Sequence, residues 1–359
     1  MSTGLTIGQY HVPYPLIQGG MGVRVSGHRL AGHVALNGGI GIIATAGLAL
    51  GSDHYDGSNY FSADRQALMD EIHKAYEIAP DGVIGVNCMV AVKNFEDAVR
   101  ASCEAGVKII ISGAGLPMNL PGLTADYPDV ALVPIVSSLK AAELIARKWH
   151  KTYNRFPDAV VVEDPDTAGG HLGEKMEKIG NGDYDQYATV RAVKEYFKTK
   201  WDQDIPIIAA GGVWDHDDLQ YALAQGADGV QMGTRFVVTE ECDADDAFKQ
   251  EYLNCTKEDI GLIMSPAGLP GRAIKRNIEQ VRQRDVDLDV YCPSACLKKC
   301  AYRENRERFC IVHALDRSQK GDIETGLVFC GTNAWKAERI STVKEVFEEL
   351  FPPEEQVTD

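Results

Sequence analysis

The chain has 359 residues and a formal net charge of −16, with 45% hydrophobic and 25% charged residues. These values are typical of a folded protein, and the length suffices for one large α/β domain with an addition or for two domains. The negative charge argues against nucleic-acid or anionic-membrane partners, because phosphate groups would be repelled. One basic run could meet an acidic carrier protein, although such a run is more often a solvated helix face. It consists of Arg272, Lys275, Arg276, Arg282 and Arg284.

The N-terminal sequence lacks a charged segment followed by an apolar one, so we expect no signal peptide. The apolar stretch Gly38–Gly51 is broken by glycine and is shorter than the ~20 residues that a membrane helix needs. These features predict a cytoplasmic protein. Its nine cysteines should therefore not form a disulfide framework, and their spacing indicates which of them could serve metal or redox chemistry.

Apolar segments alternate with amphipathic ones along most of the chain, which predicts an α/β fold, a (β/α)8 TIM barrel. The expected strands are Pro15–Gly20, Gly39–Thr45, Val83–Met89, Val107–Gly113, Ala131–Ser137, Ala159–Glu163, Ile205–Gly211 and Gly229–Phe236. Helical patterns between them include Phe95–Ala105, Lys140–Trp149, Tyr187–Lys200 and Asp215–Gly226.

The alternation stops after the eighth strand. We predict that residues 1–257 form the barrel and that residues 258–330 form a cysteine-rich insertion, which opens on the turn-rich sequence SPAGLPGR. Residues 331–359 should then return to the barrel as a C-terminal helix, with an amphipathic pattern over Ser341–Leu350.

A glycine-rich turn with a histidine follows the sixth expected strand. Gly169 and Gly170 would let the backbone approach a ligand closely, and His171 titrates near neutral pH. Because parallel barrels keep their chemistry at the carboxyl ends of strands, His171 is the candidate general base, although a loop histidine is often only structural. Glu163 ends the same strand and could orient the imidazole or a cofactor hydroxyl.

The last two strands and the first also end in small residues. Backbone amides at such turns form the phosphate site of many barrels, and the first turn could lie against a flavin ring. Asn87, at the end of the third strand, could supply an amide to that ring. This pattern predicts FMN as cofactor, bound by Gly19, Gly20, Met21, Gly22, Asn87, Glu163, Gly169, Gly170, Ala210, Gly211, Gly212, Gln231, Met232, Gly233 and Thr234.

Four cysteines of the insertion are spaced C-x3-C-x3-C-x9-C, at Cys292, Cys296, Cys300 and Cys310. Four thiolates from one short segment suit a [4Fe–4S] cluster or a structural zinc ion. Zinc sites usually use tighter C-x2-C pairs, which favours the iron–sulfur cluster, and unrelated buried thiols are the third explanation.

The segments PLIQGGMG, GVNCMV, AGGHLG, IPIIAAGGVWD and GADGVQMGTRF resemble the superfamily of FMN barrels that contains nitronate monooxygenase (2-nitropropane dioxygenase) and FabK-type enoyl-ACP reductase. The resemblance spans the chain and implies FMN and a catalytic role for His171. The four-cysteine insertion resembles the FabX-type flavoprotein, which carries FMN and a [4Fe–4S] cluster and is an acyl-ACP dehydrogenase and isomerase.

The resemblance therefore implies an oxidoreductase of fatty-acid synthesis acting on a small or carrier-bound acyl substrate, with His171 as base and hydride transfer to FMN. Two enzymatic alternatives stay open: a nitronate monooxygenase using O2, and an NAD(P)H-dependent enoyl-ACP reductase. A flavin-binding redox sensor is the non-enzymatic alternative. A homodimer is compatible with the sequence, which gives no direct sign of one.

Overall fold

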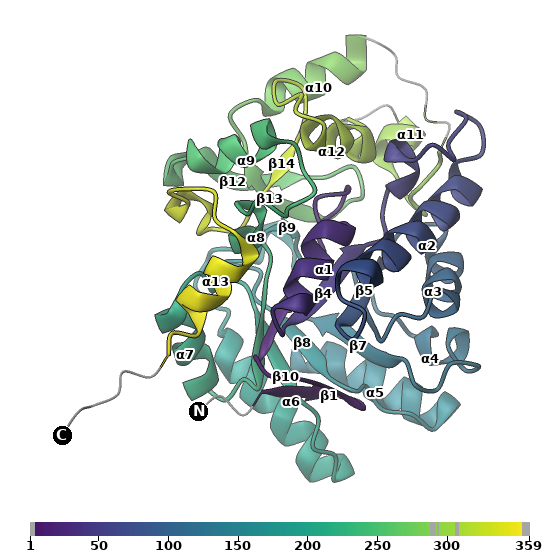
Figure 1. Ribbon diagram of the computed structural model, residues 1–359, viewed down its shortest axis with the longest axis vertical. Coiled ribbons are helices and arrows are strands. Elements are labelled where there is room, and N and C mark those ends of the chain that lie inside the picture. The colour runs from purple at the N-terminus through teal and green to yellow at the C-terminus, as the bar shows by residue number, and fades with distance from the viewer. Residues whose placement is uncertain (1–3, 288–291, 293, 306–308, 354–359) are drawn as a thin grey trace, which may run out of the picture.

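Eight parallel strands close a barrel in the computed structural model, which describes residues 4–287, 292, 294–305 and 309–353 (Figure 1). Each strand pairs with its neighbours in chain order, and the last pairs with the first through Val230 and Leu16. The predicted (β/α)8 barrel is confirmed. Its strands are β3 (Leu16–Gln18), β4 (Ile40–Ala44), β5 (Val83–Met89), β6 (Ile109–Gly113), β7 (Ala131–Val136), β8 (Val160–Glu163), β10 (Ile207–Ala210) and β11 (Gly229–Met232).

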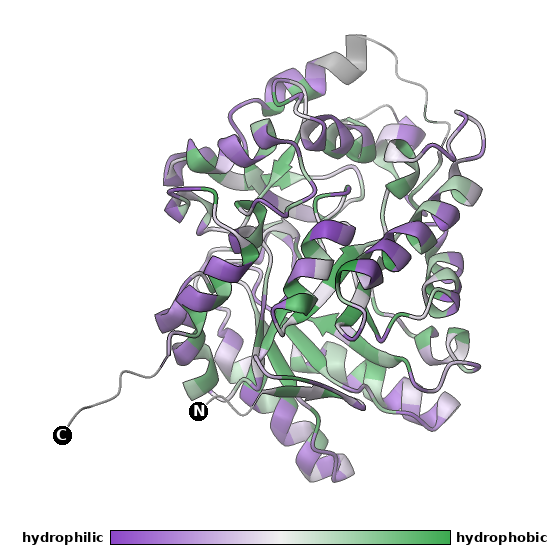
Figure 2. Cartoon of the chain, in the orientation of Figure 1, coloured by the Kyte–Doolittle hydropathy of each residue, from purple (hydrophilic) through white to green (hydrophobic). Residues whose placement is uncertain are grey.

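Helices surround the barrel, and apolar residues concentrate in the strands while polar residues lie on the outer helix faces (Figure 2). This is the pattern expected for strands covered on both faces. The helices are α1 (His28–Leu36), α2 (Tyr60–Ile78), α3 (Phe95–Glu104), α4 (Leu120–Leu123), α5 (Leu139–Tyr153), α6 (Gln186–Trp201), α7 (His216–Ala224) and α8 (Thr234–Val237). Short 3-10 turns occur at η1 (Leu48–Gly51) and η2 (Met176–Lys178).

A hairpin of β1 (Leu5–Ile7) and β2 (Tyr10–Val12) closes the amino-terminal end of the barrel. Leu5, Ile7 and Val12 belong to the same buried cluster as the inward-facing strand residues Ile17 and Ile42. The barrel interior is therefore packed with side chains at this end, and a ligand must bind at the other.

Residues after the barrel form a second sheet over its carboxyl-terminal end. It contains β12 (Ile260–Met264), β13 (Pro270–Ile274) and β14 (Val328–Phe329), and β13 also pairs with β9 (Gly170–His171). The remaining elements are α9 (Asp246–Leu253), η3 (Lys257–Asp259), α10 (Ile278–Asp287), α11 (Ala301–Asn305), α12 (Ile311–Gln319), η4 (Ala334–Lys336) and α13 (Val343–Leu350).

The structure corrects two expectations for this region. The turn-rich sequence SPAGLPGR ends in strand β13, because its last residues pair on both sides with β12 and β9. The predicted basic run is not one surface: Arg272 is 5% exposed, while Arg276 pairs with Glu251 at 3.1 Å and Arg282 pairs with Glu279 at 2.7 Å. No described helix is both long and apolar enough to cross a membrane.

Candidate active site

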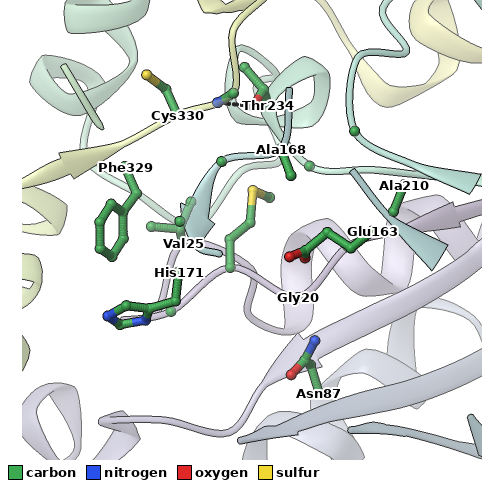
Figure 3. A pocket seen from close by; sticks show the side chains of 18 of the residues that line it. Gly20, Val25, Asn87, Glu163, Ala168, His171, Ala210, Thr234, Phe329 and Cys330 are labelled. Atoms are coloured by element: carbon green, nitrogen blue, oxygen red, sulfur yellow. Dashed lines mark hydrogen bonds between the residues drawn. The ribbon is translucent and has the colours of Figure 1, made fainter. Parts of the chain in front are cut away.

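A cavity of about 270 Å³ lies at the carboxyl-terminal end of the barrel, and residues of the second sheet also line it. Figure 3 shows Asn87, Glu163 and His171 around it, each from a different strand. Every residue predicted to bind the cofactor lines this cavity, as does His171. The sequence-distant glycine turns are therefore brought together at one place.

His171 is held by the second sheet rather than by the barrel alone. It lies opposite Gly271 in the β9–β13 ladder, and its Nε2 is 2.9 Å from the hydroxyl oxygen of Ser265. The ring of Phe329 packs edge-on against the imidazole at a centroid distance of 5.1 Å. Among the described residues, Nδ1 has no hydrogen-bond partner; in the tautomer in which Nε2 donates to Ser265, this nitrogen is able to accept a proton from a substrate.

Two titratable groups in the cavity shift in opposite directions. Burial lowers the pKa of His171 to about 4, so the imidazole is neutral over the physiological range. Burial and the neighbouring Asp164 carboxylate raise the pKa of Glu163 to about 7. A neutral base beside a carboxyl group that titrates near neutrality is an arrangement typical of proton-transfer sites.

The floor of the cavity is shaped for a close-fitting ligand. A Cβ atom added at Gly20 would lie 2.4 Å from Cβ of Asn87. The side-chain oxygen Oε1 of Gln231 is buried and has no hydrogen-bond partner among the described residues. A flavin, whose ring edge carries N–H donors as well as acceptors, fits this orphaned acceptor and the adjacent Asn87 amide.

The glycine turns after β10 and β11 also line the cavity. Gly211 and Gly212 have φ values of 104° and 76°, which glycine tolerates best, and Gly233 precedes the first turn of α8. The segment after β14 closes over them: the Asn333 amide donates to the Gly212 carbonyl at 2.6 Å, and the Gly331 amide donates to the Thr234 hydroxyl at 2.9 Å. Backbone amides at these turns suit a phosphate group.

Replacing Gly20 with alanine should weaken FMN binding by about tenfold, because the new methyl group must displace the Asn87 side chain from the ring site. A flavin fluorescence titration of the apoprotein measures this. Gly19→Ala is the matched control, since its methyl group would meet nothing closer than Gln231 Cγ at 3.4 Å. Equal affinities for the two variants would contradict the predicted ring position.

The cysteine-rich segment lies against the same cavity. Leu297 and Ile311, which follow Cys296 and Cys310 directly, both line it. Cys296, Cys300 and Cys310 are buried, and Cys292 is partly exposed. Burial and the other three thiols raise the pKa of Cys296 to about 12, so the other three cysteines are near enough to interact with Cys296 electrostatically.

The one described group of three or more possible metal ligands within 4.8 Å of one another lies elsewhere, at His28, Glu71 and Asp243. Its carboxylates already have partners there: Asp243 accepts from the Gly27 amide at 2.8 Å, and Glu71 pairs with the His28 ring at 2.9 Å. These contacts cap the amino-terminal end of α1, so the three side chains lie together for a structural reason.

Several residues of the site have no signal in the sequence. Phe329 and Asn333 line the cavity but follow the cysteines at a large sequence distance from the barrel. Ser265 lies outside the lining, in a segment that predicts only turns, and contacts His171. These residues reach the site because β13 pairs with β9, and this contact is set by tertiary structure.

A cavity with one neutral base and glycine-rich turns, at the carboxyl-terminal end of a (β/α)8 barrel, is the site of a barrel enzyme. The chain belongs to the nitronate monooxygenase family, whose model matches residues 5–353. It is an FMN-type oxidoreductase of the group that contains nitronate monooxygenase and FabK, and the predicted superfamily is confirmed.

Similar proteins carry several names. The chain is 28% identical over 267 residues to (3aS,4S,5R,7aS)-5-hydroxy-7a-methyl-1-oxo-octahydro-1H-indene-4-carboxyl-CoA dehydrogenase of Mycobacterium tuberculosis, a match covering 74% of this chain and 64% of that relative. It is 25% identical over 327 residues to a probable nitronate monooxygenase of Staphylococcus saprophyticus, covering 81% and 84% of the two chains.

Solved structures show the same fold. FabK from Thermotoga maritima superimposes with a TM-score of 0.69 at 25% identity, covering 94% of this chain and 92% of that one. A nitroalkane oxidase from Streptomyces ansochromogenes has a TM-score of 0.68 at 19% identity, covering 94% and 95%, and supports the fold alone.

Proposed function

We propose that the protein is an FMN-dependent acyl-ACP dehydrogenase and isomerase that makes an unsaturated acyl chain in fatty-acid synthesis. The observation that carries the proposal is one cavity that joins a neutral base to an apolar wall. His171 lies on one side, and Ile311, Val312 and Leu315 of α12 contribute the apolar wall. The dehydrogenase name of the mycobacterial relative, whose substrate is a CoA thioester, supports the same reaction type.

Different residues of the cavity would bind the phosphate of FMN, bind its ring and move the substrate proton. The cradle of Gly211, Gly212, Gly233 and Thr234 would hold the FMN phosphate, and Asn87 with Gln231 would hold the edge of the ring. FMN would supply the acceptor for a hydride from the β-carbon of a saturated acyl thioester. His171 would take the α-proton, so that a carbon–carbon double bond forms and the acyl group loses two electrons.

Isomerisation needs no further redox chemistry. After His171 has released the α-proton to solvent, the neutral imidazole would remove a proton from the γ-carbon and return that proton to the α-carbon, which moves the double bond from position 2 to position 3. An imidazole that is neutral at physiological pH is ready for the first step without prior deprotonation. Phe329 packs edge-on against the imidazole, and the second sheet holds the backbone of His171.

Cys292, Cys296, Cys300 and Cys310 would hold a [4Fe–4S] cluster. A tetrahedral zinc ion with Zn–S of about 2.3 Å needs sulfurs about 3.8 Å apart, and no three of these described thiols meet within 4.8 Å. The Ser294 hydroxyl lies between two of the cysteines in sequence, is buried, and has no hydrogen-bond partner among the described residues. Such a donor suits a cluster sulfide.

Removing the Ser265 hydroxyl should lower the rate of α-proton removal by up to about tenfold, because one hydrogen bond orients the imidazole. The variant Ser265→Ala should bind FMN with unchanged affinity, since Ser265 is outside the cavity lining. Turnover and flavin titration on the same preparation separate the two effects. An unchanged turnover rate would show that the ring orientation does not depend on this contact.

The function is tested by anaerobic mixing of the FMN-loaded enzyme with saturated acyl-ACP. Loss of the flavin's visible absorbance, with one unsaturated acyl product per flavin reduced, is the expected result. Bleaching only by NAD(P)H, with reoxidation by enoyl-ACP, would make the protein an enoyl reductase. Turnover of alkyl nitronates with O2, and none of acyl thioesters, would make it a nitronate monooxygenase, the name of its staphylococcal relative.

A further inference from the structure

The loop that carries His171 is fixed by residues from outside the barrel. The Leu172 amide donates to the Pro270 carbonyl at 2.9 Å, and the Thr332 amide donates to the Thr167 carbonyl at 3.0 Å. A Cβ atom at Gly169 would lie 2.5 Å from the backbone of Cys330 and Gly331, so no side chain fits there. The loop is therefore enclosed between β13 and the segment after β14.

One charged side chain lies inside this enclosure. Arg272 pairs with Gly170 in the ladder next to His171 and is 5% exposed. Its Nη1 donates to the Ala168 carbonyl, and its Nη2 donates to the Pro165 carbonyl at 3.1 Å. The two bonds span the turn that leads from β8 to the histidine.

This arginine has no direct ion pair with any described carboxylate. Burial lowers the pKa of Arg272, and Cys330, Asp164, Asp166 and Glu163 act in the opposite direction at longer range. A buried cation is costly, and neutral donors could satisfy two carbonyls. The use of arginine here implies that the fork geometry or the charge serves the site.

We propose that Arg272 is a positioning residue for the loop that carries His171. Its guanidinium group fixes the carbonyls of Pro165 and Ala168, and its charge acts on the carboxyl groups at the end of β8. The inference rests on the proposed function, in which His171 is the base. It assigns to the second sheet a role in the chemistry of the barrel.

Glu163 is one of the carboxyl groups on which this charge acts, and it lines the same cavity as His171. Arg272 lowers the pKa of this carboxyl against the upward effects of burial and Asp164. The Tyr184 hydroxyl donates to the backbone carbonyl of Glu163 at 3.2 Å, and Cys330, Asp164 and Asp166 are further titratable groups that act on Arg272. Removing the arginine's charge must therefore raise the pH at which Glu163 ionises.

Two variants of the full-length, FMN-loaded protein separate geometry from charge. Arg272→Lys keeps the charge but loses the fork, and Arg272→Gln loses both. Arg155→Gln is the matched control, because Arg155 also clamps a backbone carbonyl, that of Val130 at 2.6 Å, but precedes β8 at the opposite end of the barrel. The readouts are kcat for acyl-ACP, flavin absorbance as a function of pH, and hydrogen exchange of residues 165–171.

Both Arg272 variants should lower kcat by about 10- to 100-fold and speed exchange in the loop, because the base is displaced. Arg272→Gln should also move the midpoint of the flavin pH titration upward, whereas Arg272→Lys and the control should leave it in place. A purely structural role would not produce this difference between lysine and glutamine.

Wild-type kcat in Arg272→Lys, or the same midpoint in all variants, would overturn the proposal. If Arg272→Gln does not fold, the lysine variant still decides the geometric part through kcat and exchange. A wild-type enzyme that does not oxidise acyl thioesters would overturn the proposed function, while the flavin titration and exchange would still test Arg272.

Discussion

Replacing His171 with alanine should slow acyl-ACP oxidation by about 10²- to 10⁴-fold, the usual contribution of a positioned general base. The physical reason is that His171 is the one histidine among the described residues that line the cavity, while Glu163, whose pKa burial and Asp164 raise to about 7, is partly protonated under assay conditions. FMN should remain bound, because the predicted phosphate cradle is formed by other turns. Stopped-flow measurement of flavin reduction, with the FMN content of each sample, checks both statements.

The pH dependence of the wild type provides an independent check. Because burial lowers the pKa of His171 to about 4, the imidazole stays neutral well below pH 7. The loss of activity caused by protonation of this base should therefore appear only near pH 4. A limb near 7 would belong to Glu163 and should persist in the alanine variant. His216→Asn is the control for loss of a histidine elsewhere. His216 lies on α7, and its Nδ1 is 2.8 Å from the backbone carbonyl of Leu350 on α13. Full acyl turnover in His171→Ala would remove the histidine from the mechanism.

Changing Cys296 to serine should abolish the proposed cluster, so that iron and acid-labile sulfide fall from about four per chain to background. The same change should lower the melting temperature, because metal binding in such segments contributes directly to folding free energy. Leu297 and Ile311, which line the cavity beside two of the cysteines, should then lose their fixed positions and acyl affinity should fall. FMN content should change little.

Metal analysis on anaerobically purified protein gives the readout. Cys103→Ser is the matched control, because Cys103 is equally buried but lies in α3, away from the cavity lining. Retention of all iron in Cys296→Ser would refute the proposed ligand set. A wild type with about one zinc ion and no iron would replace the cluster by a structural zinc site.

Much of the barrel follows from local sequence. Strands such as Val160–Glu163 are runs of β-branched residues with no polar face, which only a sheet covered on both sides accommodates. The glycines at strand ends predicted the cavity because the carboxyl ends of parallel strands must meet at one end of a barrel. His171 and Asn87 both follow or end expected strands, and both line the cavity.

The second sheet could not be predicted in this way. Pro270–Ile274 contains proline, glycine and arginine and has weak strand propensity, yet it pairs with both β12 and β9. Arg272 appeared in sequence as part of a basic surface, but this pairing buries it against the loop of His171. Local propensity carries no information about a partner strand about a hundred residues away.

The sequence by itself therefore determined the barrel, the end of it that binds ligands, and the residue types gathered there, because these depend on periodicity and on the fixed direction of parallel strands. Only the tertiary structure decided how the base is held. Ser265, Arg272 and Phe329 surround the His171 loop through long-range strand pairing, and burial in that enclosure makes the imidazole neutral.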